Sequence, residues 1–121
     1  LKTNLGYAAV NMACDNLHVE CAKLLLAIPG IDVNVQSEVG NTPLTVSSYK
    51  GGVEVVKLLL AHPDIDVNKG YYPPLLAACT SDNANIEVVK ALLAHPKIDV
   101  NKPMEDGIFT ALLMACNFNQ I

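Results

Sequence analysis

The 121-residue chain contains no arginine and no tryptophan, and its aromatic residues are only four tyrosines and two phenylalanines. Eight lysines face 12 acidic residues, which gives a net charge of −4. Proteins that bind nucleic acids usually present a basic face, often with arginine on phosphates and bases. The composition therefore argues against nucleic acid as a partner.

Long apolar runs are also missing. No run approaches the ~18 residues that a membrane-spanning helix needs, and no segment resembles a signal peptide, so we expect no membrane insertion. Hydrophobic content is 51% and charged content 17%, which is typical of a globular chain rather than a disordered one. Because the sequence starts at Leu1 without methionine, we expect a fragment of a longer protein.

What the chain does contain is an internal repeat. Three related segments each end in Asp-Val-Asn, and these endings are spaced by 34 and 33 residues. A fixed period of this length is the mark of stacked repeats. We therefore expect a single domain, 1–121, with repeats at about 1–34, 35–68 and 69–101 and a partial one at 102–121. The three segments are HVECAKLLLAIPGIDVN (18–34), GGVEVVKLLLAHPDIDVN (51–68) and NIEVVKALLAHPKIDVN (85–101).

Each repeat predicts a pair of helices, most clearly in repeat two. Val53–Ala61 places apolar residues along one wide helical face, and the proline after His62 ends the pattern. Upstream, Thr42 is a plausible N-cap and Pro43 a plausible first residue of a shorter helix. Gly51 and Gly52 then separate the two helices.

The repeat resembles the ankyrin repeat. The resemblance implies an all-α fold, a solenoid of about 3.5 stacked helix-turn-helix units with β-hairpin fingers. It also implies protein–protein interaction through a concave face formed by the fingers and first helices. The matching residues are Gly40-Asn41-Thr42-Pro43-Leu44, Gly51, Val55-Val56-Lys57-Leu58-Leu59-Leu60 and Asp66-Val67-Asn68.

Several positions depart from this family's pattern. Repeat three has only six residues between Asn68 and Leu75 where repeat two has nine, so we expect a shorter finger. Its loop around 80–85 is two residues longer. Leu17 stands where the family has glycine between the helices. Thr45 replaces the family's turn histidine, so we expect looser coupling between neighbouring turns.

The cysteines are best interpreted as structural. Three of them share one slot of the first helix, which Ser48 occupies in repeat two, and this slot requires a small buried side chain. Neighbouring helices lie roughly 8–10 Å apart, too far for a disulfide. Cys21 falls where Val55 and Val88 fall in later repeats. Reduced thiols favour a cytoplasmic location, with the nucleus as an alternative. The three that share the slot are Cys14, Cys79 and Cys116.

No catalytic set stands out, and we expect neither an enzyme nor a cofactor or metal site. His62 and His95 end second helices, where the helix dipole favours a histidine. The aspartates of the Asp-Val-Asn signature should make local turn bonds, and its asparagines should bond within their own hairpins. In ankyrin repeats such asparagines can also be hydroxylated, and this remains open for Asn34, Asn68 and Asn101.

The residues expected to bind a partner lie in the fingers, at the ends of the first helices and in the longer loop. Large aromatic side chains on such a face are typical anchors, although each could instead pack on a neighbouring turn. The acidic loops suggest a partner surface that is apolar with some positive charge. The candidates are Tyr7, Glu38, Asn41, Tyr49, Lys50, Tyr71, Tyr72, Ser81, Asp82, Asn83, Glu105, Asp106, Phe109 and Phe118.

These observations predict a monomeric scaffold that binds an unidentified protein. The alternative is a regulatory or targeting ankyrin segment of a larger enzyme, channel or secreted effector. The sequence names neither the partner nor the source.

Overall fold

The computed structural model describes residues 4–82 and 85–100. This part of the chain contains six helices, and the first of them is the longest. They are α1 (Asn4–Asp15), α2 (Val19–Leu26), α3 (Pro43–Tyr49), α4 (Val53–Leu60), α5 (Pro74–Thr80) and α6 (Ile86–Leu93).

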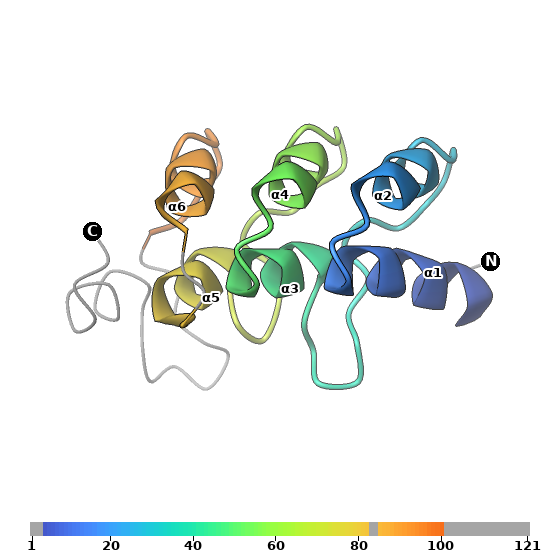
Figure 1. Cartoon of the computed structure of the whole chain (residues 1–121), viewed down its shortest axis with the longest axis horizontal. Coiled ribbons are helices and arrows are strands. Elements are labelled where there is room, and N and C mark those ends of the chain that lie inside the picture. The colour runs from blue at the N-terminus through green and yellow to red at the C-terminus, as the bar shows by residue number, and fades with distance from the viewer. Residues whose placement is uncertain (1–3, 83–84, 101–121) are drawn as a thin grey trace.

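The helices stack in two rows. Helices α1, α3 and α5 form one row and α2, α4 and α6 the other, while the loops that lead into α3 and α5 project away from both rows (Figure 1). The predicted all-α repeat solenoid is confirmed. The loop before α5 is visibly shorter than the loop before α3, as its length predicts (Figure 1). In the described residues, these fingers contain turns and no β-strands, so they are not the β-hairpins that the resemblance implies.

Local signals set the helix boundaries. The Thr42 hydroxyl accepts the backbone N–H of Thr45 at 3.2 Å, and Pro43 follows as the first helical residue. Pro74 is likewise the first helical residue of α5. The Asn85 side chain caps α6 by accepting the N–H of Glu87 at 2.8 Å. These contacts satisfy N–H groups that a helix start leaves without partners.

The core lies between the two rows. Val55, Val56 and Leu59 of α4 are buried, and so are the equivalent residues of α6. Each buried valine or leucine contributes roughly 1.5–3 kcal/mol relative to exposure. In α2 the first two of these positions hold Cys21 and Ala22, which makes the packing of repeat one thinner.

Leu17 adopts a backbone conformation that usually belongs to glycine. Its φ of 56° matches the 73° of Gly51, which occupies the equivalent position before α4. The Leu17 side chain packs over Gly52, where an added Cβ would lie 2.3 Å from a leucine methyl group. Leucine in the left-handed region is strained by about 1–2 kcal/mol, and contact with the core offsets this strain.

The small slot of the first helix is buried as predicted. Cys14, Ser48 and Cys79 are at most 1% exposed, and the Ser48 hydroxyl has no hydrogen-bond partner. Burial raises the pKa of Cys14 to about 11 and raises the pKa of Cys79 as well. Cysteine fills this slot with a weak donor, whereas serine leaves a stronger polar group unsatisfied. Cys116 lies outside the described residues.

Cys21 is exposed, although its counterparts Val55 and Val88 are buried. The reason is its place in the stack, because α2 forms the open flank of the described helices (Figure 1). Leu24 is 73% exposed on the same helix. Sequence register therefore gives the correct helix position but not its burial at an end of the row.

Asn34 and Asn68 join successive repeats, so the prediction that they bond their own hairpins is wrong, and Asn101 lies outside the described residues. The Asn34 side chain donates to the carbonyl of Asp64 and accepts the N–H of Asp66, both at 2.8 Å. Asn68 repeats both contacts with Lys97 and Asp99 at the same distances. We call this two-bond arrangement the asparagine clamp.

The signature aspartates make the local turn bonds that the sequence predicts. One Asp32 oxygen accepts the N–H of Asn34 at 3.0 Å, and Asp66 does the same for Asn68 at 3.1 Å. Each aspartate thereby holds the backbone of the asparagine that forms the clamp.

Neighbouring turns are also directly coupled, although the family's histidine is missing. The Thr45 hydroxyl donates to the carbonyl of Tyr72 at 2.8 Å and lies 3.1 Å from the Thr42 hydroxyl. The backbone N–H of Tyr71 adds a bond to the Gly40 carbonyl at 2.8 Å. A threonine therefore makes the link between repeats two and three that the histidine was expected to make.

The two helix-end histidines act as hydrogen-bond acceptors. Nδ1 of His62 accepts the N–H of Asp64, and Nδ1 of His95 accepts the N–H of Lys97, both at 3.1 Å. These bonds shape the loops that the asparagine clamps hold.

Candidate functional site

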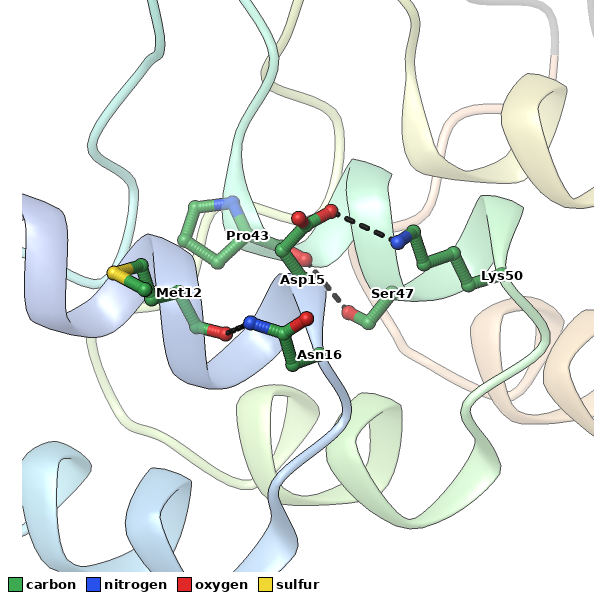
Figure 2. A network of polar contacts seen from close by, with 6 residues as sticks. All are labelled: Met12, Asp15, Asn16, Pro43, Ser47 and Lys50. Atoms are coloured by element: carbon green, nitrogen blue, oxygen red, sulfur yellow. Dashed lines mark hydrogen bonds and ion pairs between the residues drawn. The ribbon is translucent and has the colours of Figure 1, made fainter.

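The C-terminal end of α3 carries two of the predicted binding residues. Tyr49 is 48% exposed there. Lys50 follows it, and its Nζ lies 3.1 Å from a carboxylate oxygen of Asp15, at the end of α1 (Figure 2). This ion pair crosses from repeat one to repeat two. The polar contacts of Asn16 and Ser47 shown beside it stay within their own repeats, on the carbonyls of Met12 and Pro43.

Ser81 differs from its predicted role because its side chain is only 2% exposed. Its hydroxyl donates to the backbone carbonyl of Tyr49, so it fixes repeat three against repeat two. A buried hydroxyl that bonds the neighbouring repeat is not available to a partner, and we therefore remove Ser81 from the proposed contacts. Asp82, the next residue, is exposed. We call Asp15, Tyr49, Lys50 and Asp82 the helix-end row.

The tip of the finger before α3 forms a second group. Glu38 and Val39 are exposed there, and Val39 is 71% exposed. The turn is closed by the N–H of Gly40 on the Ser37 carbonyl at 2.8 Å and by the Gln36 side chain on the Gly40 carbonyl at 2.8 Å. These bonds hold an apolar side chain in solvent at the end of an ordered loop.

Asn41 is half-buried at the base of this turn. Its side-chain oxygen is buried without a hydrogen-bond partner, and its backbone carbonyl accepts the N–H of Ser37 at 2.9 Å. Its position is closer to the finger's own structure than to the exposed tip.

Tyr71 and Tyr72 lie in the shorter finger and contact each other. Their ring centroids are 6.2 Å apart at an interplanar angle of 84°, an edge-to-face pair. Both are half-buried, and Tyr72 packs against the core. The packing alternative considered for these aromatics therefore describes Tyr72 well.

The remaining candidates are not placed. Tyr7 lies in α1 among residues whose side chains are not described. The others lie outside the described residues, and they are Asn83, Glu105, Asp106, Phe109 and Phe118.

Two residues of these groups escaped the sequence prediction. Asp15 aligns with Tyr49 when the first helices are superimposed on the Cys14–Ser48 slot, so register could have found it. Val39 could have been found as a single apolar residue within a polar turn, Glu38 to Asn41.

Reactive chemistry is sparse in residues 4–82 and 85–100. They contain no group of three or more His, Cys, Asp or Glu residues that could hold a metal ion. The raised pKa of Cys14 and Cys79 works against nucleophilic thiols. Within the same residues, every helix is too short or too polar to cross a membrane.

Comparison with known proteins gives consistent matches. A family model described as ankyrin repeats (3 copies) matches residues 1–71. The chain is also 54% identical over 44 residues to the SMC5-SMC6 complex localization factor protein 1 of Homo sapiens, and 52% identical over 44 residues to that of Bos taurus. Each match covers 36% of this chain and 4% of the relative's length.

Proposed function

This chain belongs to the ankyrin-repeat family, and on that premise we propose that it recognises a partner protein through the helix-end row and the fingertip. Ankyrin repeats are generally protein-interaction modules. The proposed contacts are Glu38, Val39, Tyr49, Lys50 and Asp82, together with Asp15. The protein acts as a monomeric, non-catalytic scaffold in the cytoplasm or nucleus, and residues 1–121 form one domain.

The exposure of Tyr49 and Val39 is the observation that carries this proposal. Both are large apolar side chains in solvent, and both adjoin charged residues. Interface hot spots are typically aromatic or apolar anchors within a polar rim. The loops after α2 and α4 are not part of the proposed surface. Their asparagines, Asn34 and Asn68, already form hydrogen bonds with the next repeat.

A second candidate is a targeting segment within a longer protein. It is favoured by the relatives, which are named as localization factors of a protein complex and of which the matched segment is 4%. In this case the same surface would bind the protein that directs localisation. The two candidates differ in what the rest of the polypeptide does, not in the chemistry of this surface.

The test is a quantitative pull-down from source cells with a Val39→Ser, Tyr49→Ala double variant. Leu24→Ala is the matched control, because it removes an exposed apolar side chain from the open flank of α2. We expect the double variant to lose partners that wild type and control retain, with unchanged helical circular dichroism. Retention by the double variant together with loss by Leu24→Ala would move the site to the open flank.

A further inference from the structure

We propose that the ring of Tyr49 and the carboxylates of Asp15 and Asp82 together receive a lysine or arginine side chain of the partner. This proposal rests on the proposed function and adds the chemistry of the partner at its centre. Three observations support it: how the Tyr49 backbone is held, which charged residues share the helix-end row with it, and what its exposed ring can bind.

Tyr49 is held from both neighbouring repeats. On one side, the residue after it, Lys50, pairs with Asp15 of repeat one at 3.1 Å (Figure 2). On the other side, the buried Ser81 of repeat three donates its hydroxyl to the Tyr49 carbonyl. The backbone that carries the ring is therefore fixed before a partner arrives. An anchor fixed in advance loses less conformational entropy when it binds.

The charges of the helix-end row favour a cation. The helix-end row contains two acids and one lysine, and both acids are exposed. The Asp15–Lys50 pair has side chains 55% and 40% exposed, and an exposed pair of this kind is worth only about 0–1 kcal/mol. Asp15 can therefore exchange Lys50 for a partner's cation at little loss.

In the second row of helices, α2, α4 and α6, the acids are matched by lysines on the same helix. In α2, Glu20 pairs with Lys23 at 3.6 Å, and in α6, Glu87 pairs with Lys90 at 3.7 Å. Each of these acids has its counter-ion one turn away on its own helix. The charges of these acids in α2 and α6 are therefore compensated, whereas the helix-end row has one more acid, Asp82, than it has lysines.

An exposed aromatic ring beside carboxylates suits a basic side chain. The face of tyrosine attracts cations by about 0.5–1 kcal/mol at exposed sites. Arginine can also form two parallel hydrogen bonds with a carboxylate, which lysine cannot. We therefore expect arginine to bind more tightly than lysine, with an apolar neighbour for the rest of the ring.

The first test titrates N-acetyl-arginine amide into the ¹⁵N-labelled chain. N-acetyl-citrulline amide is the matched probe, because it has nearly the same shape without the charge. We expect saturable shifts at Tyr49, Lys50 and Asp82 with the arginine compound only. Equal shifts with both compounds, shifts elsewhere, or no saturable shift would each overturn the proposal.

Variants assign the response to the named groups. Asp82→Asn should weaken binding of the arginine compound by about 2- to 5-fold, and Tyr49→Phe should retain binding because the ring remains. Glu54→Gln, which removes an exposed acid from α4, should have no effect. A loss with Glu54→Gln equal to that with Asp82→Asn would show general charge attraction and would refute the site.

The same variants separate this inference from the proposed function. If the cellular partner is lost with Val39→Ser, Tyr49→Ala but binds an Asp15→Asn, Asp82→Asn variant with unchanged affinity and salt dependence, the surface stands and its cation preference fails. If the partner is retained by the Val39 and Tyr49 variant, the surface itself fails.

Discussion

Replacement of Asn34 by alanine should weaken the contact between repeats one and two. The change removes both bonds of the asparagine clamp, to the carbonyl of Asp64 and the N–H of Asp66, each 2.8 Å long. A neutral hydrogen bond contributes a net 0.5–1.5 kcal/mol, so two contribute about 1–3 kcal/mol. Water can reach the exposed partners after the change, which places the expected loss at about 1–2 kcal/mol.

The measurement is equilibrium unfolding in urea, followed by circular dichroism. With an m-value near 2 kcal/mol/M, such a loss lowers the unfolding midpoint by about 0.5–1 M. Asn34→Asp keeps the oxygen that accepts the Asp66 N–H but loses the donor to Asp64, so it should lose at least half as much stability.

The matched control is Asn16→Ala. Asn16 also donates a side-chain hydrogen bond, at 2.9 Å, but to the carbonyl of Met12, four residues earlier in the same repeat. We expect this variant to lose less than about 0.5 kcal/mol, as is usual for surface changes. If the midpoints of Asn34→Ala and Asn16→Ala coincide, the clamp does not couple the repeats and the reasoning is refuted.

Three further predictions concern the core. Ser48→Cys should raise the free energy of unfolding by about 1 kcal/mol, since it removes an unsatisfied buried hydroxyl. Ser47→Ala should lower the free energy of unfolding by about 0.5–1.5 kcal/mol, because Ser47 donates to a carbonyl at 2.6 Å. Shifts of the urea unfolding midpoint in opposite directions would confirm both. Gly52→Ala should destabilise by more than about 1 kcal/mol through contact with Leu17, and the loss should shrink in a Leu17→Ala background, as a double-mutant cycle measures. Burial raises the pKa of Cys14 to about 11, so the folded state holds a proton that the unfolded state releases, and stability should fall between about pH 9 and 11, by less in Cys14→Ala when unfolding is measured across that range.

Much of the fold could be predicted because the same sequence pattern recurs in three repeats, and each copy indicates the same pair of helices. The apolar period placed α4 and α6 and their buried valines, and Thr42 and Pro43 marked the start of α3. The asparagine clamp could not be predicted in the same way. Periodicity shows that Asn34 recurs, but a short polar side chain can bond its own turn or a loop 30 residues later, and only the spacing of the stacked helices decides between them.

The candidate surface was predictable in outline rather than in detail. Tyr49 and Lys50 follow from their place at the end of α3. Ser81 was wrongly predicted to be exposed, because its hydrogen bond to the Tyr49 carbonyl of the neighbouring repeat depends on the stacking of the helices, which the register of one helix does not record. Val39 has no aromatic ring, and a single aliphatic residue within a polar turn is a weak sequence signal for an anchor.

The buried thiols of Cys14 and Cys79 can report when repeats one and three open locally. Alkylating reagents attack the thiolate, and with a pKa of about 11 only about one in 10⁴ Cys14 thiols is ionised at neutral pH, inside a helix packed on its neighbours. Cys14 and Cys79 can therefore react only when their repeats open, whereas exposed Cys21 reacts from the native state. The order in which an alkylating reagent labels Cys14 and Cys79 would show which of the two repeats opens first, and Cys21 would serve as the reference that reacts without opening.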